Sequence, residues 1–350
     1  MSPDLTPDTP ASMSSQTPDR LLPPDDPLRV ALHDEVHSRP SARIRLPALI
    51  VYVAVLNDGV TRDIECEHLR RLPGQQDLPL QALNGNFLRL RFDDHTVKWE
   101  RHTEFTGYFI VQPLPASADL GASAPTLLSQ PAIAPAWLRA IPGRTVAAIQ
   151  MALVNGDLTD APGLMAQAHR WLGLRTVVAS QLGNGHSWAL TGFQIDANGF
   201  ERMLVIAPPG TTDTRAGRIA QRLLELETYR LMALRGLPVA KAIGPMLSAA
   251  ESELADVTAR LENKAAADQE LLDTLVAMAA RVERATAEHA YRFAATRAYD
   301  TLVGQRIAEL REKAIPGTQT LGEFMQRRLS PAMATVAATG QRLVSLSARI

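Results

Sequence analysis

The chain has 350 residues, of which 46% are hydrophobic, and it carries 36 Lys and Arg against 37 Asp and Glu. This length and composition allow two or three units with a sizeable core, and the near-neutral charge argues against a general nucleic-acid binder. A single cysteine, Cys66, excludes an internal disulfide and a cysteine-only metal site. We expect Cys66 to be a small buried residue on a helix.

The first 27 residues are dominated by Pro, Ser, Thr and Asp and contain no apolar core region. This composition excludes a secretory signal and predicts a disordered tail over 1–27. No run of 18 apolar residues occurs, so nothing within 1–350 is predicted to cross a bilayer as a helix. As given, the chain is expected to be soluble and cytoplasmic.

An α+β unit is predicted next. The apolar, β-branched run 46–56 predicts a buried strand, and the amphipathic pattern over 61–72 predicts a helix that buries Ile64, His68 and Leu72. Three further strands are predicted at 87–92, 95–102 and 107–113, the first two forming a hairpin.

The same order of elements recurs after a Pro/Ala/Ser-rich stretch. A strand at 144–154 and a helix at 162–173 precede strands at 176–182, 187–195 and 200–208. The turn signal Gly183-Asn184-Gly185-His186 predicts a hairpin turn rather than a phosphate loop. We therefore predict a mostly antiparallel sheet with helices on one face, possibly a duplicated unit, forming a head domain over 28–212.

Residues 213–350 have an almost continuous helical pattern. Apolar residues at steps of three and four predict a long helical hairpin or bundle, with breaks at 236–238, near Asn263 and at 316–317. A dimerising coiled coil is the alternative, and it would make the chain a homo-oligomer. The pattern runs to Ile350 without a stop signal, from which we expect the chain to be truncated before a C-terminal part.

Two clusters of ionisable residues are candidates for chemistry. HDEVHSRP (33–40) holds Glu35, His37 and Arg39, and KWERHTEF (98–105) holds Glu100, Arg101, His102 and Glu104 beside Trp99. The catalytic candidates are Glu35, His37, Glu100, His102 and Glu104, and the ligand-binding candidates are Arg39, Arg101 and Trp99.

A structural interpretation competes for each cluster. On a strand, Lys98, Glu100 and His102 would face one way, while Trp99 and Arg101 face the other and Trp99 enters the core. The first cluster would dock the N-terminal arm. No metal motif is complete, so we predict no metal site, and the sequence names no cofactor.

Four blocks together resemble domain-of-unknown-function family 3422, a group of uncharacterised, predicted membrane-anchored bacterial proteins. They are HDEVHSRP, VKWERHTEFTGY, ELETYRLMALRGLPVAKAIGP and FAATRAYDTLVGQRIAELREKAIPGTQTLGEFMQRRLSPAM. The resemblance covers about residues 28–350 and brings no reaction, cofactor or catalytic residue. It implies a hydrophobic anchor that attaches longer members to the inner membrane. The layout also looks like that of CorA-type ion channels, by analogy only.

Three hypotheses follow. The favoured one is a membrane-associated scaffold or binding protein with a non-catalytic head for a ligand or partner. The second is a metal- or phosphate-dependent enzyme using the two clusters, and the third is a channel-like or ion-transport accessory protein. The sequence leaves enzyme activity open.

Overall fold

The computed structural model describes residues 23–35, 42–114, 132–174, 176–263 and 268–350. The chain divides into two units, Met1–Pro40 and Ser41–Ile350. In the first unit, α1 (Arg29–Glu35) is a short helix. The predicted tail lies almost wholly outside the described residues. Everything that follows concerns the second unit.

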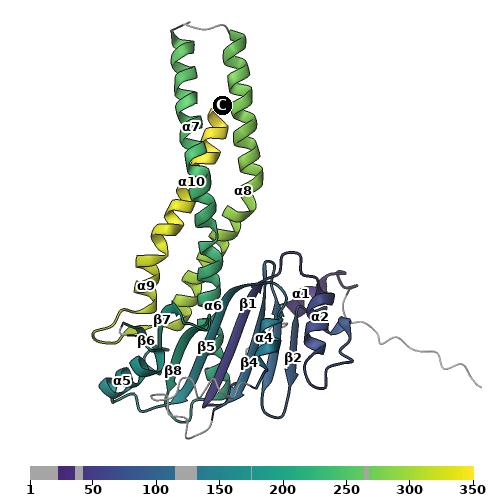
Figure 1. The fold of residues 1–350 in the computed structure, drawn as a ribbon, viewed down its shortest axis with the longest axis vertical. Helices are drawn as coiled ribbons and strands as arrows, with labels where there is room; N and C mark the ends of the chain where they lie inside the picture. Colours follow the sequence, from purple (N-terminus) through teal and green to yellow (C-terminus); the bar gives the residue numbers. More distant parts are fainter. Residues whose placement is uncertain (1–22, 36–41, 115–131, 175, 264–267) are drawn as a thin grey trace, which may run out of the picture. The chain divides into compact units, whose positions relative to one another are not determined.

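Within the described residues, nine strands form one sheet in the order β2-β3-β4-β1-β5-β8-β7-β6-β9 (Figure 1). They are β1 (Ala48–Leu56), β2 (Phe87–Arg91), β3 (Thr96–Arg101), β4 (Phe105–Pro113), β5 (Arg144–Asn155), β6 (Val178–Leu182), β7 (Ser187–Ile195), β8 (Glu201–Ala207) and β9 (Lys313–Ala314). Every pairing is antiparallel except that of β5 with β8. The predicted α+β class with a mostly antiparallel sheet is confirmed, with one parallel pair that the sequence analysis did not foresee.

The two predicted repeats share their strand order but not their strand directions. Outward from the β1–β5 junction the order is β1-β4-β3-β2 on one side and β5-β8-β7-β6 on the other. However, β4 is antiparallel to β1 whereas β8 is parallel to β5. The two halves are therefore not superposable copies of one unit.

Helices cover both faces of the sheet, whereas the sequence analysis placed them on one. On the first face lie α2 (Arg62–Arg70), the 3₁₀ helix η1 (Leu80–Leu83), α4 (Pro135–Arg139) and α5 (Ala161–Leu172). All four tryptophans are buried in the cores on this face. Cys66 is 1% exposed within it, as expected, but Ile64 is 47% exposed because α2 turns the face containing Glu65, Cys66 and Leu69 inward.

The second face packs against helices that follow in the sequence. α6 (Asp213–Leu234) lies on it, joined by the C-terminal part of α8 (Asp268–Leu310) and by α9 (Leu321–Arg328). Ile50, Ile149 and Met151 from the strands share one core with Leu223, Met232 and Val303 from the helices. The core on this face is thus continuous across the predicted boundary at residues 212/213.

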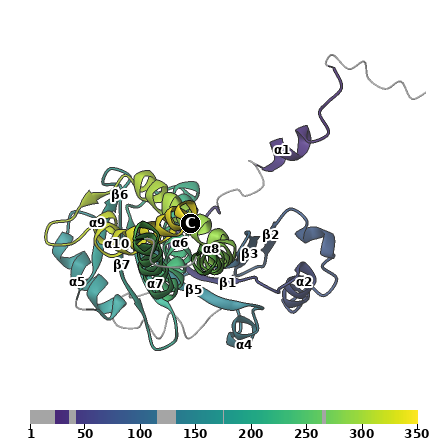
Figure 2. The ribbon, with the colours of Figure 1, turned by 90° about the horizontal axis from the view of Figure 1, so that it is seen from above.

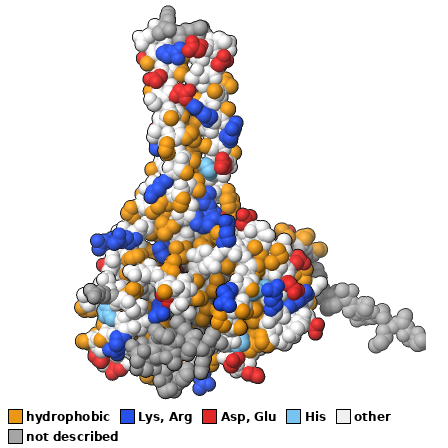
Figure 3. All heavy atoms as spheres, in the orientation of Figure 1, with side chains coloured by type: hydrophobic (Ala, Val, Ile, Leu, Met, Phe, Trp, Pro, Cys, Tyr) orange, Lys and Arg blue, Asp and Glu red, His pale blue; other side chains and the backbone are white. Residues whose placement is uncertain are grey.

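α7 (Gly236–Glu262) and the N-terminal part of α8 extend beyond the sheet as an antiparallel hairpin, seen end-on in Figure 2. α10 (Ser330–Arg349) packs against both helices. Their core contains Leu247, Leu254, Met278, Val282 and Leu343, which belong to the predicted apolar stripes. Figure 3 shows acidic and basic side chains interspersed along the visible face of this hairpin.

The predicted interruptions of the helical region are confirmed. α6 gives way to α7 at Arg235, α7 ends at Glu262, and α8 and α9 are separated by residues 311–320. Leu261 is an exception to the stripe, because it is half exposed at the end of α7. Among the described residues, no helix is long and apolar enough to cross a bilayer.

Candidate functional site

The first predicted cluster cannot be placed. Residues 36–41, which include His37 and Arg39, lie outside the described residues, and Glu35 is described only as the last residue of α1. The hypothesis of an enzyme that uses both clusters therefore stays a prediction.

The second cluster is split between the two faces of β3. Trp99 is 1% exposed in the core on the α2 side, and Lys98 and Glu100 point to the α6 side. The alternation predicted from the sequence is confirmed. Trp99, a candidate ligand-binding residue, is thus placed in the core.

Glu100 and His102 border a space too small for a substrate. Lys98 Nζ donates to Glu100 Oε2 at 2.9 Å and lies over the Phe109 ring. His102 stacks on Phe105, with ring centroids 4.3 Å apart. The cavity they share with α6 has a volume of only about 20 Å³, which is room for about one water molecule.

Arg101 lies on the other side and is fixed by a buried carboxylate. Glu65 on α2 is fully buried, and its Oε2 is 2.7 Å from Arg101 Nη1. Thr106 Oγ1 donates to Glu65 Oε1 at 2.6 Å, and Arg101 Nη2 donates to the Val60 carbonyl at 2.8 Å. Because the ion pair with Glu65 and the hydrogen bond to Val60 hold the guanidinium at both ends, Arg101 is positioned before any ligand arrives.

Arg101 borders a hollow of about 550 Å³, which we call the sheet–hairpin hollow. It lies where loops at one end of the sheet meet the α6–α7 junction and α8. Its lining residues are Leu56, Asn57, Asp58, Gly59, Val60, Thr61, Arg101, Thr103, Glu104, Arg144, Arg235 and Tyr291. This volume is typical of a small-molecule site.

Positive charge exceeds negative charge in this lining. Glu104 forms an ion pair with Arg292 of α8. Among the described residues, Arg144 and Arg235 have no ion-pair partner, which leaves two guanidinium groups available against the single carboxylate of Asp58. The N-terminus of α2 also opens here, and the side chain of its N-cap residue Thr61 makes no capping hydrogen bond within the described structure. The hollow is therefore suited to an acidic ligand.

Among the described residues, the groups of the lining that could transfer a proton are Asp58, Glu104 and Tyr291. The lining contains no His, Cys, Lys or Ser among the described residues. Nor do the described residues include any group of three or more His, Cys, Asp or Glu that could hold a metal ion. The arrangement can recognise and orient an acid through arginine forks.

Arg144, Arg235 and Tyr291 were not predicted as site residues. Each is an ordinary polar residue at the end of an element or on a helix surface, and the three are brought beside Arg101 only by the tertiary fold. No local sequence signal could have identified them.

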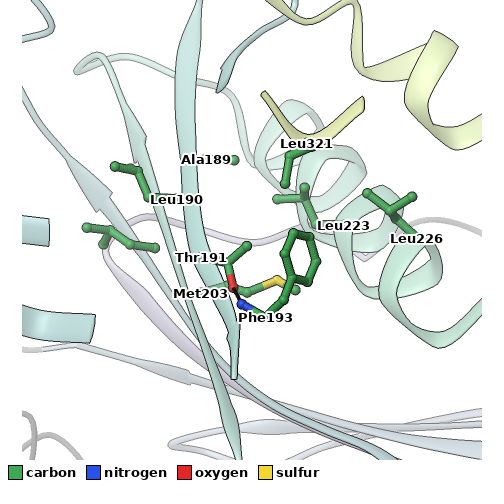
Figure 4. A pocket seen from close by; sticks show the side chains of 9 residues that line it. Ala189, Leu190, Thr191, Phe193, Met203, Leu223, Leu226 and Leu321 are labelled. Carbon is green, nitrogen blue, oxygen red and sulfur yellow. Dashed lines mark hydrogen bonds between the residues drawn. The ribbon is translucent and has the colours of Figure 1, made fainter. Parts of the chain in front are cut away.

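A closed cavity between β7, β8, α6 and α9 is a packing feature rather than a site. Its volume is about 10 Å³, and Figure 4 shows Phe193, Met203, Leu223 and Leu321 around it. The only polar contact drawn there is the Phe193 amide donating to Thr191 Oγ1 at 3.2 Å. A space of this size and polarity holds at most one water molecule.

Comparison with known protein families gives one result. Residues 24–350 match the family described as protein of unknown function (DUF3422). The chain belongs to this family. No curated protein and no solved structure matches it. The family assignment covers almost the whole chain, including every residue of the sheet–hairpin hollow, and it names no activity.

Proposed function

We propose that this DUF3422 protein is a non-catalytic binding protein that takes a small organic acid into the sheet–hairpin hollow. The observation that supports this is the convergence of Arg101, Arg144 and Arg235 from β3, β5 and the α6–α7 junction. Arg101 is held by the buried carboxylate of Glu65. Arginine forks recognise carboxylates through two parallel hydrogen bonds, so Arg144 and Arg235, which have no ion-pair partner among the described residues, favour an acid.

The available carboxylate of the hollow restricts the class of ligand further. Asp58 stands among the arginines, so a ligand with a donor or a positive group beside its carboxylate has partners of both signs. Amino acids such as glutamate have this chemistry. A bound acid would touch both the sheet loops and the helices that lead into the hairpin.

Thermal unfolding of the full chain with added succinate or glutamate tests this proposal. A ligand that binds only the folded state raises Tm with its concentration. The double variant Arg144→Ala/Arg235→Ala should lose the shift. The exposed Arg170→Ala on α5 is the matched control and should keep it.

Three results would count against the proposal. The first is that no organic acid raises Tm at millimolar concentration, and the second is that the double variant responds like the unmodified chain. The third is conversion of a bound acid to a product, which would favour the enzyme hypothesis instead.

We propose in addition that the chain forms homo-oligomers through its helical region and that longer relatives are attached to a membrane. The first of these is supported by two exposed apolar side chains on α8, Leu272 and Val276, which could form a helix-mediated contact. Native mass spectrometry of the chain should show dimers or larger species that Leu272→Glu/Val276→Glu dissociates. Fractionation of a longer relative should place it with membranes, and recovery in the soluble fraction would contradict the attachment.

A further inference from the structure

A second hollow, which we call the arginine pocket, lies apart from the sheet–hairpin hollow and has a volume of about 450 Å³. It forms where the β6–β7 turn, the N-terminal half of α6 and the end of α8 meet. The lining residues are Leu182, Gly183, His186, Ser187, Thr212, Arg215, Arg218, Ile219, Arg222, Glu309, Leu310 and Arg311. Four of the twelve are arginines.

Three of the arginines come from one stripe of α6. Arg215, Arg218 and Arg222 are spaced by three and four residues, which places them on the same face of the helix. Like charges at these spacings repel, so the stripe has an unfavourable energy when nothing neutralises it. The pocket also includes the N-cap Thr212, whose Oγ1 accepts from the Arg215 amide at 3.3 Å. The positive end of the 22-residue helix α6 thus adds to the same field.

Negative charge in the pocket is limited and already paired. Glu309 is the one carboxylate among the lining residues, and it lies 3.1 Å from Arg222 and 2.8 Å from Arg306. Among the described residues, Arg215, Arg218 and Arg311 have no ion-pair partner. The pocket therefore has a large positive excess.

Two buried polar atoms of the pocket residues lack partners within the described structure. Ser187 is 1% exposed, and its Oγ makes no hydrogen bond there. The Nδ1 atom of the adjacent His186 is likewise buried without a partner. Burial, and then the charge of Arg215, lower the pKa of His186, so its ring is neutral near pH 7 and can donate one hydrogen bond. The pocket wall thus contains a hydroxyl and a ring nitrogen that have no hydrogen-bond partner within the described structure.

The walls of the pocket are fixed to each other by the backbone. The Gly183 amide donates to the Leu310 carbonyl at 2.8 Å, and the Asn184 amide donates to the Arg311 carbonyl at 3.1 Å. Arg311 has a φ of 46°, a left-handed conformation that usually selects glycine after a helix. Arginine is kept there at an energetic cost, and its side chain lines the pocket.

From these contacts we propose that the arginine pocket binds a soluble anion carrying two or more phosphate groups. Guanidinium forks match phosphate oxygens, and the three arginines without an ion-pair partner among the described residues suit more than one phosphate. The volume admits a small molecule. A ligand that carries both a carboxylate and a positive group suits this lining less well. The one carboxylate of the lining, Glu309, is already paired with arginines and cannot bind the positive group. The inference is independent of the function proposed for the sheet–hairpin hollow.

Isothermal titration of the full chain with inorganic pyrophosphate tests the inference. We expect saturable one-site binding. Since a hydrogen bond to a charged group is worth roughly a tenfold change in affinity, Arg215→Ala/Arg218→Ala should weaken it about a hundredfold. Arg170 on α5 is exposed and lies outside the pocket lining. The control Arg170→Ala also removes positive charge, and it should leave the affinity for pyrophosphate within about twofold.

Two further variants make the outcome specific. Ser187→Ala alters no charge and should weaken pyrophosphate binding several-fold, which a diffuse electrostatic attraction would not produce. Arg144→Ala/Arg235→Ala in the sheet–hairpin hollow should bind pyrophosphate normally, so failure of one proposal leaves the other standing.

The inference is overturned if pyrophosphate does not bind at millimolar concentration. It is equally overturned if the α6 double variant binds as tightly as the unmodified chain, or if Arg170→Ala weakens binding as much as that variant does. Capture by phosphatidylglycerol vesicles without any pyrophosphate binding would also reject a soluble ligand and favour a membrane surface.

Discussion

Replacing Glu65 by Gln should destabilise the fold strongly for a change that preserves shape. Glu65 is fully buried, accepts from Thr106 Oγ1 at 2.6 Å and pairs with Arg101 at 2.7 Å. A Gln side chain can accept from one of these donors, but it directs its own NH₂ group at the other. Breaking a buried ion pair from one side costs about 3–5 kcal/mol.

The lower end of that range applies here. The Arg101 side chain is 18% exposed, and the residue keeps its hydrogen bond to the Val60 carbonyl at 2.8 Å, so it stays partly compensated. We therefore expect Glu65→Gln to lower the free energy of unfolding by about 3 kcal/mol. The free energy of unfolding of a native protein is about 5–15 kcal/mol, so the variant should still fold.

Urea denaturation followed by circular dichroism measures the difference. Glu67→Gln is the matched control, because it lies on the same helix and its carboxylate is 61% exposed, 3.4 Å from Arg70. An exposed ion pair of this kind contributes at most about 0.5 kcal/mol to the free energy of unfolding. If Glu65→Gln costs no more than Glu67→Gln, the ion pair does not anchor Arg101 and the reasoning fails.

Three other outcomes are expected. Burial, and then the neighbouring Glu227, raise the pKa of Glu201 well above its usual range, so the folded state holds a proton that the unfolded state loses. Stability should thus fall as the pH rises above the unfolded-state pKa of about 4.3, and Glu201→Gln should raise Tm at neutral pH while leaving it unchanged at pH 3. Gly143→Ala should lower the free energy of unfolding by more than about 2 kcal/mol in urea titrations, because φ is +116° and the new Cβ would lie 2.5 Å from the Leu56 carbonyl oxygen. Cys66, 1% exposed and with a pKa raised by burial, should react with a thiol reagent such as DTNB only after unfolding, and rapid labelling of the native chain would show that α2 opens.

Local periodicity was sufficient to predict most of the elements. The run at 46–56 became β1, and the alternation around Trp99 placed that side chain in the core and Glu100 on the opposite face. Apolar steps of three and four correctly gave Leu247, Met278 and Leu343 as core residues of the hairpin. These outcomes depend on neighbours within one strand or helix.

Features that join distant segments were not predictable. The turn at 183–186 is a hairpin turn, as expected, yet the fold also sets it beside Arg215 and Arg311. The spacing of Arg215, Arg218 and Arg222 directly after the cap Thr212 is a signal for an anion site that can be seen in the sequence, although this site was not among the predictions. Parallel pairing of β5 with β8 and the return of β9 to the sheet depend on long-range packing that single-sequence patterns do not encode.

The edge strand β9 has a consequence for synthesis of the chain. Ser180 on β6 donates to Glu312, 132 residues later, and accepts from the Leu321 amide, so the rim of the sheet is sealed by residues that are synthesised much later than β6. At about 5–20 residues per second, translation exposes that rim for roughly ten seconds. During this interval β6 offers unsatisfied amides to any passing strand, and a nascent chain stalled before codon 313 should be a preferred client of chaperones.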